Sequence, residues 1–300
     1  MTFWERNQLK LAPFLFLVPA IFIFLVYVIY PIFDSIWVSF HEWNGMDKDG
    51  VRGTGKPNWE FVGFKNYITL FTDDDEFYVS LFNNIKWLVF SLLAIPIGLA
   101  LALFVNQKIL GIRYIKSLFY FPFVINAVVI GVIFTWFYNP KYGALAYVLS
   151  FFGLDPIPFL ADENLATYGI IIASFFPGIA YTMILYITGL TGVSREMIEA
   201  GRIDGASEAR IFLSVIMPYV KSTIVVVATY LTVTVLKAYD IVFVTTRGDF
   251  ETNLLAVKMM DEFSKFLHFG RASTVSILIF VSVVPIIVLN VFRNKEENSL

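Results

Sequence analysis

Residues 166–190 read ATYGIIIASFFPGIAYTMILYITGL, a stretch without a single charged residue. A helix needs about 20 mostly apolar residues to cross the hydrocarbon layer of a membrane, so this stretch is long enough to span it. Five further apolar stretches of this kind occur, and polar segments separate all six. With 58% hydrophobic and 15% charged residues, the composition excludes an ordinary soluble domain. The sequence therefore predicts an all-α polytopic membrane protein with six transmembrane helices.

The predicted spans cover about residues 11–40, 83–105, 117–138, 166–190, 218–238 and 272–292. The first block follows a head that carries Arg6 and Lys10, but it is too long for a signal peptide and lacks a small-residue cleavage site. We therefore expect a retained helix whose N-terminus is cytoplasmic. The inner segments are shorter than the outer ones and carry as many basic residues, which favours this orientation. The expected organisation is a cytoplasmic head, a transmembrane domain and a cytoplasmic tail, at residues 1–10, 11–292 and 293–300.

Most of the predicted spans contain proline. A proline inside a helix frees a backbone carbonyl, which a neighbouring group or water in a protected cavity must satisfy. A bundle with an internal path is therefore expected, although each proline by itself is also explained by the higher frequency of proline in membrane helices. These prolines are Pro19, Pro31, Pro96, Pro122, Pro177 and Pro285.

One inner segment, at about residues 191–217, predicts two short helices joined at a glycine. Ser194 is expected to cap the first helix, and Ser207 the second. Gly205 lies where a left-handed C-terminal residue is needed, and Pro218 fits the first turn of the fifth span. Docking of another protein and contact with lipid both fit such a compact, amphipathic loop. Its small residues would allow a close approach: Ala200, Gly201, Gly205 and Ala206.

The segment resembles the signature loop of binding-protein-dependent ABC importer permeases, in which Glu-Ala-Ala is followed by a glycine and then by Ile-x-Leu-Pro. The residues in register with this signature are Glu199, Ala200, Gly205 and Pro218. Further positions resemble the carbohydrate branch of the family, namely Asp204, Ala206 and Phe212. The departures are small or conservative and comprise Gly201, Val215 and Met217.

The resemblance extends over about residues 11–292 and implies a transmembrane permease domain with a cytoplasmic coupling helix-turn-helix loop. In this family the loop is seated in a cleft of an ATPase subunit, so Glu199 is expected to make a charged contact there and Gly205 to supply the turn. The resemblance also implies a bacterial or archaeal inner (plasma) membrane protein. The imported solute would be a carbohydrate or a related polyol or glycoside.

The implied partners are a second permease subunit in a heterodimer, two ATPase subunits and an extracytoplasmic solute-binding protein. No nucleic acid is expected. The chain itself is expected to be non-catalytic and to bind no metal or cofactor, because the partner ATPase would hold ATP and magnesium. The Gly-x4-Gly-Lys pattern at residues 50–56 does not alter this expectation, since Pro57 replaces the Ser or Thr that would hold magnesium.

Eight residues are expected to line the solute path. Gly178 and Tyr181 match positions that line the sugar site in maltose-type permeases, and aromatic faces suit pyranose rings. The other six are Ser174, Thr182, Thr232, Lys237, Tyr239 and Asp240. An alternative stays open, since Ser and Thr commonly join membrane helices, and Lys237 and Asp240 could pair at the outer interface.

The stretch 237–246 resembles the end of the fifth helix in maltose-type and glycerol-phosphate-type permeases. Gly-Gly-Pro usually follows it, whereas this chain has Arg247, Gly248 and Asp249. The loop is expected to face the solute-binding protein, so the departure bears on partner fit. The acidic run at residues 73–76 predicts a solvated outer loop.

The main alternative is an ion-driven secondary transporter of a small solute. Such a protein needs a coupling carboxylate deep in a span, and Asp34, the only acid well within a predicted span, lies near the outer end of the first. The paired, similarly interrupted halves of an inverted-repeat transporter are not found in the sequence. The favoured interpretation is therefore the permease subunit of an ABC importer.

Overall fold

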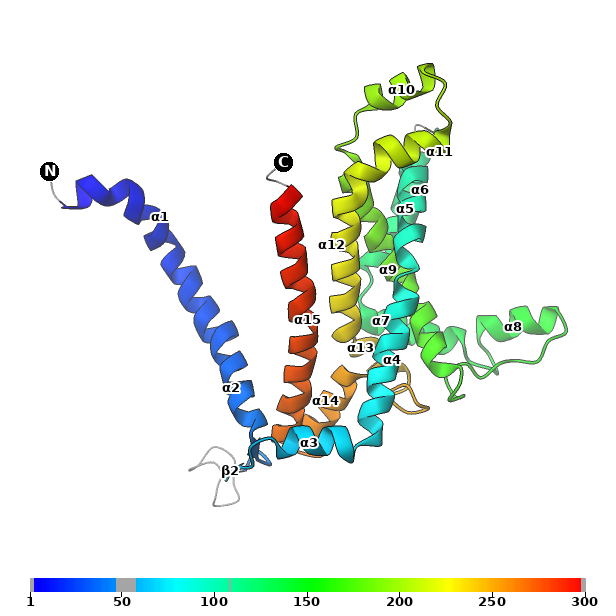
Figure 1. Ribbon diagram of the computed structural model, residues 1–300. Coiled ribbons are helices and arrows are strands. Elements are labelled where there is room, and N and C mark those ends of the chain that lie inside the picture. The colour runs from blue at the N-terminus through cyan, green and yellow to red at the C-terminus, as the bar shows by residue number, and fades with distance from the viewer. Residues whose placement is uncertain (1–2, 47–57, 108, 298–300) are drawn as a thin grey trace. The chain divides into compact units, whose positions relative to one another are not determined.

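The protein is described here by a computed structural model that covers residues 3–46, 58–107 and 109–297 (Figure 1). The chain divides into two units: unit 1 consists of residues 1–74 and 259–278, and unit 2 of residues 75–258 and 279–300. Helices dominate both, as expected from the apolar blocks. The Gly-x4-Gly-Lys pattern at residues 50–56 lies outside the described residues.

Unit 1 opens with a continuous helical run made of α1 (Phe3–Phe24), a π-helical turn (Leu25–Ile29) and α2 (Tyr30–Ser39). The expected cytoplasmic head thus belongs to the helix from Phe3 onward. Most of the large apolar side chains between Phe14 and Trp37 are exposed, and none of the most hydropathic window of residues 14–39 is buried within the chain. Such a surface suits a lipid or protein environment in place of water.

A short hairpin follows this run. Strand β1 (His41–Glu42) pairs antiparallel with β2 (Glu60–Phe61), and α3 (Lys65–Thr72) comes next. The remaining elements that contribute to unit 1 are parts of α14 (Leu255–Ser264) and α15 (Phe269–Glu297). Asn66 connects α3 to the end of α2 and to β1, because its buried Nδ2 donates to the carbonyl oxygens of Ser39 and His41, at 2.9 and 3.0 Å.

Unit 2 is a helix bundle. Helix α9 lies at its centre and contacts α4, α5, α6, α7, α12 and α13. In Figure 1, α10 and α11 lie beyond one end of α12, and α13 lies at the other end. The helices are α4 (Asp75–Ser91), α5 (Ala94–Val105), α6 (Ile112–Val124), α7 (Ala127–Phe137), α8 (Ala144–Phe151), α9 (Ala166–Leu190), α10 (Arg195–Ile203), α11 (Glu208–Ile211), a π-helical turn (Phe212–Ile216), α12 (Met217–Leu236) and α13 (Asp240–Thr245).

The predicted all-α, polytopic fold is confirmed. Four helical runs among the described residues are long and apolar enough to span a membrane: 14–39, 75–105, 166–190 and 208–236. Helices α6 and α7 together provide a fifth candidate, and the start of α15, Phe269–Pro285, is a shorter apolar helix. The number of six spans stays a prediction.

The third predicted span, residues 117–138, is wrong as a single straight helix. It is broken into α6 and α7, which meet at 98°. Ile125 and Asn126 are extended, with ψ of 131° and 146°, and the Asn126 side chain accepts a hydrogen bond of 2.8 Å from the Val128 amide. Pro122 cannot donate to the helix, and the Asn126 cap begins a new one, so both residues favour the break.

Two apolar clusters form the core of unit 2. One gathers around Trp87, Ile130 and Val242, and the other around Met183, Tyr186 and Val220. Large apolar side chains also cover the outside of the bundle, as expected for helices that face lipid.

Candidate functional site

A cavity of about 550 Å³ lies within unit 2. Residues of both apolar clusters line it, including Trp87 and Val235 from the first and Ala94 and Leu231 from the second. Its walls come from α4, α5, α6, α7, α9, α12 and α13. A cavity of this volume is in the range that accommodates small-molecule ligands.

The interruptions of the helices meet at this cavity. Ile125 lies at the break between α6 and α7, and Lys237 at the break between α12 and α13. Pro177 lies inside α9, while Ser91 and Ala94 flank the join of α4 and α5. At membrane depth, irregular backbone is tolerated where it is buried in protein or lines a cavity. The internal path expected from the prolines thus has a structural counterpart in unit 2.

Five of the eight predicted path residues line the cavity: Ser174, Gly178, Lys237, Tyr239 and Asp240. At Gly178 a Cβ atom would meet no other atom within 4 Å, so the cavity reaches the backbone of α9 directly. Within the described residues, no ion pair joins Lys237 to Asp240, and both side chains are exposed.

Tyr181 does not line the cavity but supports its aromatic wall. Its ring is 4.9 Å from that of Phe123, in a stacked arrangement, and 4.0 Å from that of Tyr230. Both of these partners line the cavity. Four further lining residues were not predicted from the sequence: Trp87, Phe123, Tyr230 and Thr234. Tyr230 and Thr234 are four residues apart in one helix, a spacing that could have placed both on a single face.

Thr182 and Thr232 are not among the lining residues, and the hydroxyls of both donate to backbone carbonyls. Thr182 is fully buried and donates to the carbonyl of Ile179 at 2.9 Å and to that of Ala94, in α5, at 3.3 Å. Thr232 donates to the carbonyl of Ala228 at 2.8 Å. The bond from Thr182 to Ala94 joins α9 to α5 and supports, for this residue, the alternative of polar groups that hold membrane helices together, whereas the Thr232 bond stays within α12.

The second feature of unit 2 is the predicted helix-turn-helix, at α10 and α11. Gly205 has a φ of 77°, and the turn closes with hydrogen bonds from Ala206 N to Gly201 O (2.9 Å) and from Gly205 N to Arg202 O (3.1 Å). This pair of bonds is the Schellman motif, in which glycine provides the left-handed residue after the helix. The turn predicted at Gly205 is confirmed.

An ion pair ties the two arms of the turn together. Arg202 Nε and Nη2 donate to the two carboxylate oxygens of Glu208, at 2.7 and 3.1 Å. The hydrogen bond from Arg202 lowers the pKa of the Glu208 carboxyl, and the same bond raises the pKa of the guanidinium. Bidentate geometry of this kind fixes orientation, although both side chains are exposed.

The helix caps follow the sequence prediction in part. Ser207 accepts a hydrogen bond of 3.3 Å from the Arg210 amide, as predicted, and Pro218 lies in the first turn of α12. The predicted Ser194 cap is wrong, since that hydroxyl instead lies 3.4 Å from a carboxylate oxygen of Glu196. The second short helix also continues through a π-helical turn into α12 without a break.

The surface of the loop is open, while its base is packed. No residue of α10 is buried, and Glu199, Ala200, Asp204 and the 85%-exposed Ile203 all face outward. Gly201 is half-buried and packs on the buried Ile211, since a Cβ at Gly201 would lie 3.3 Å from Cγ1 of that residue. Phe212, half-buried, packs on the cluster around Tyr186. The loop is therefore an exposed element on a firm support.

Two helices connect the cavity with the loop. Along α9, Gly178 lies about 18 Å from the last residue, Leu190, at the helical rise per residue. Along α12, Tyr230 lies about 20 Å from the first residue, Met217. Gly189 of α9 packs so closely on Thr223 of α12 that a Cβ there would clash with the threonine hydroxyl. The loop is therefore connected to α9 and α12, two of the helices that form the walls of the cavity.

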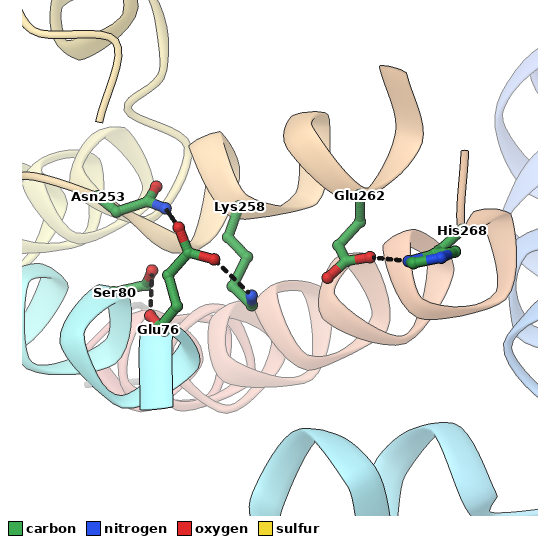
Figure 2. A network of polar contacts seen from close by, with 6 residues as sticks. All are labelled: Glu76, Ser80, Asn253, Lys258, Glu262 and His268. Carbon is green, nitrogen blue, oxygen red and sulfur yellow. Dashed lines mark hydrogen bonds and ion pairs between the residues drawn. The ribbon is translucent and has the colours of Figure 1, made fainter. Parts of the chain in front are cut away.

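A polar network holds the other end of the bundle (Figure 2). Glu76 receives hydrogen bonds from Asn253 Nδ2 at 2.8 Å and from Lys258 Nζ at 3.2 Å. The solvated loop predicted for residues 73–76 is wrong in this respect, because Asp75 and Glu76 begin α4. The predicted solvent exposure is confirmed for Asp73, Asp75 and Glu76, although Glu76 also pairs with a cation from a distant segment.

The adjoining loop has an unusual backbone. Arg247, Phe250 and Glu251 have φ of 59°, 55° and 56°, and Gly248 has φ of 91°. Asn83 restrains this loop because its Nδ2 donates to Glu251 O at 2.7 Å and to Asn253 O at 3.0 Å. Left-handed non-glycine residues cost energy and persist where the surroundings hold them.

An apolar bundle with an internal cavity at its helix breaks, joined by two helices to an exposed helix-turn-helix, defines a membrane-embedded transport subunit. The chain belongs to the family of binding-protein-dependent transport system inner membrane components, whose sequence profile matches residues 94–295. The resemblance noted in the loop is thereby confirmed. A subunit of this family is a non-catalytic part of its transporter, which sets aside the ion-driven alternative.

Relatives match over nearly the whole chain. The osmoprotective compounds uptake permease protein GgtC of Synechocystis sp. is 30% identical, over 95% of this chain and 100% of its own length. The alpha-glucoside transport system permease protein AglF of Rhizobium meliloti is 31% identical, over 97% and 84%. The trehalose/maltose transport system permease protein MalF of Thermococcus litoralis is 26% identical, over 98% and 97%.

The fold has a counterpart among solved structures. A chain of a bacterial ABC transporter involved in the import of the acidic polysaccharide alginate is similar, with a TM-score of 0.79 at 19% identity, over 99% of this chain and 98% of that chain. A second structure contains a bacterial alginate ABC transporter with an alginate pentasaccharide-bound periplasmic protein, and its matching chain gives a TM-score of 0.80 at 19% identity, over 96% and 95%.

Proposed function

We propose that this chain is the permease subunit of an ABC importer that carries a carbohydrate, or a related polyol or glycoside, across the membrane. The observation that supports this most directly is the cavity where the helix breaks meet. Aromatic side chains of Trp87, Phe123 and Tyr230 line it together with the polar groups of Ser174 and Thr234. Aromatic rings and scattered polar groups suit a ligand that has apolar ring faces and hydroxyl groups.

In the proposed mechanism, the helix-turn-helix receives the motion of a separate ATPase. Glu199 makes the charged contact with that subunit, and the Arg202–Glu208 pair keeps α10 and α11 together so that the loop moves as one body. The loop is continuous with α12 and follows closely on α9. Its displacement would therefore tilt both helices, and with them the walls that carry Gly178 and Tyr230.

The proposed assembly contains a second permease subunit in a heterodimer, two ATPase subunits and an extracytoplasmic solute-binding protein. ATP and magnesium are bound by the ATPase, not by this chain. The loop is placed on the cytoplasmic side together with both termini, in a bacterial or archaeal inner (plasma) membrane. The relatives named as permeases for alpha-glucosides and for trehalose/maltose support a carbohydrate-type solute.

Filling the cavity tests the transport role. The Gly178→Leu variant has room for its first side-chain atom, so the bundle should fold, while the new side chain would occupy the solute path. We expect uptake of radiolabelled maltose or trehalose by the reconstituted transporter to fall at least tenfold. A matched control is Ile172→Phe, which enlarges an exposed side chain of the same helix. Wild-type uptake in the Gly178→Leu variant would overturn the assignment of the cavity.

Co-purification tests the coupling role. We expect the Glu199→Lys variant to lose the ATPase subunit while it retains the second permease subunit, because α10 is exposed and makes few contacts within the chain. Glu163→Lys reverses an exposed charge outside the loop and serves as the control. If both variants retain the ATPase equally, Glu199 is not part of the contact.

A further inference from the structure

Unit 1 contains a cavity of its own, with a volume of about 410 Å³. The hairpin of β1 and β2, helix α3 and the first turn of α15 bound it. Its base is tightly built, since a Cβ at Gly270 would clash with the His41 carbonyl oxygen. The lining is mainly polar, in contrast with the cavity of unit 2, and the transport mechanism does not use it.

Two carboxylates face each other across the hairpin. Glu42 and Glu60 are directly paired in the register of β1 and β2, and both line the cavity. Like charges in directly opposite positions destabilise a strand pair. Lys65 compensates for Glu42 through an ion pair of 3.0 Å, whereas Glu60 has no such cation among the described residues. A two-residue strand pair therefore retains an unfavourable pair of charges at the edge of a cavity.

Two carboxylates and two basic groups line this cavity, together with His268, which pairs with Glu262 at 2.9 Å. Glu42 and Glu60 oppose Lys65 and Arg271, and Arg271 has no ion pair within the described part of the chain. The two carboxylates would repel an anionic ligand, and the ammonium and guanidinium groups would repel a cationic one. The lining therefore favours a neutral ligand that can both donate and accept hydrogen bonds.

Amide groups and an indole complete the lining. Asn44 and Asn58 add amides, which provide both donors and acceptors. Trp43 is held in place by a hydrogen bond of 3.0 Å from Nε1 to the Met46 carbonyl and by ring contact with Phe269 at 4.9 Å. A fixed aromatic side chain beside several planar polar groups is the combination that suits a ring bearing hydroxyl groups.

We propose that the cavity of unit 1 is a second binding site for a neutral carbohydrate, distinct from the transport cavity of unit 2. The carbohydrate class of the ligand and the side of the membrane on which this site lies rest on the proposed function. The span of residues 14–39 separates this cavity from the N-terminus, so cytoplasmic termini place it on the extracytoplasmic side. There it would hold solute near the transporter before or after translocation.

Saturation-transfer difference NMR on the two permease subunits and the ATPase in lipid nanodiscs, without the solute-binding protein, tests this proposal, with maltose as the neutral probe and glucuronic acid as the anionic one. The Gly178→Leu substitution is present in every sample, so that binding in the transport cavity is blocked. Arg271→Ala and Glu60→Ala remove charges from the unit 1 cavity, and Lys141→Ala and Glu163→Ala remove the same charges from exposed positions elsewhere. Arg271→Gln and Glu60→Gln serve if an alanine variant fails to fold.

We expect saturable binding of maltose in the Gly178→Leu background, weakened at least tenfold by either cavity variant and unchanged by the two controls. Three outcomes would overturn the second site: no binding in that background, equal binding in all variants, or preferential binding of glucuronic acid. None of these bears on the transport role, which is judged by uptake. Conversely, wild-type uptake by Gly178→Leu would refute the transport cavity and leave the dependence on Arg271 and Glu60 as the test of this site.

Discussion

Replacement of Gly205 by alanine should loosen the helix-turn-helix without creating a steric clash. No atom lies within 4 Å of the position that a Cβ would occupy, so the cost comes from the backbone alone. At a φ of 77°, an L-residue with a Cβ is disfavoured by about 1–2 kcal/mol. That energy raises the open population of the turn by roughly 5- to 30-fold.

Hydrogen exchange measures this change directly. The amides of Gly205 and Ala206 close the turn, so the peptide that contains them should exchange faster by the same factor when opening limits exchange. Gly205→Asn is the matched control, since asparagine tolerates the left-handed conformation better than alanine and should have a smaller effect. Equal acceleration in the two variants, or none in the alanine variant, would refute the argument from backbone strain.

Three further predictions concern individual contacts. Ser207→Ala should lower the stability of α11 by about 1 kcal/mol, seen as faster amide exchange at its start, because the hydroxyl caps that helix. Glu76→Gln should destabilise the protein by about 1–3 kcal/mol in thermal unfolding, since it takes the carboxylate from the ammonium of Lys258, whose side chain is 3% exposed. For Arg202→Gln, an NMR titration should show a higher pKa of Glu208 than in the wild type. Since the wild-type pKa is lowered, the ion pair stabilises the loop above the ordinary carboxyl pKa, and that contribution is lost as the pH falls through the lowered value.

The long helices could be predicted from hydropathy because lipid requires every backbone group to be satisfied within the segment. The fourth span, residues 166–190, agrees with α9 at both ends. The broken third span could not be predicted in this way, since α6 and α7 remain apolar on both sides of the break. Hydropathy measures composition, and the bend depends on which carbonyls find partners in the packed bundle.

The turn at Gly205 was also predictable, because a Schellman motif is a local structure that a few neighbouring residues specify. Which residues line the cavity was harder to predict from the sequence. Thr182 and Thr232 carry the same functional group as Thr234, yet their hydroxyls bond to nearby carbonyls, while Thr234 lines the cavity. The sequence alone does not show which of the three threonines lines the cavity. The rotation of each helix about its own axis, set by tertiary packing, decides between the two roles.

The same reasoning explains why the cavity lies where the helices are interrupted. A continuous helix satisfies its own backbone and can pack along its full length, so a bundle of such helices would close around a solid core. An interrupted helix leaves amides and carbonyls that need partners, and the breaks at Ile125 and Lys237 direct such backbone toward the same space. If those groups contact the solute, then substitutions that straighten α6 into α7, such as Pro122→Ala with Asn126→Leu, should reduce uptake even though they add no bulk to the cavity. Unchanged uptake in a variant shown to have a continuous helix would mean that the breaks shape the bundle without taking part in transport.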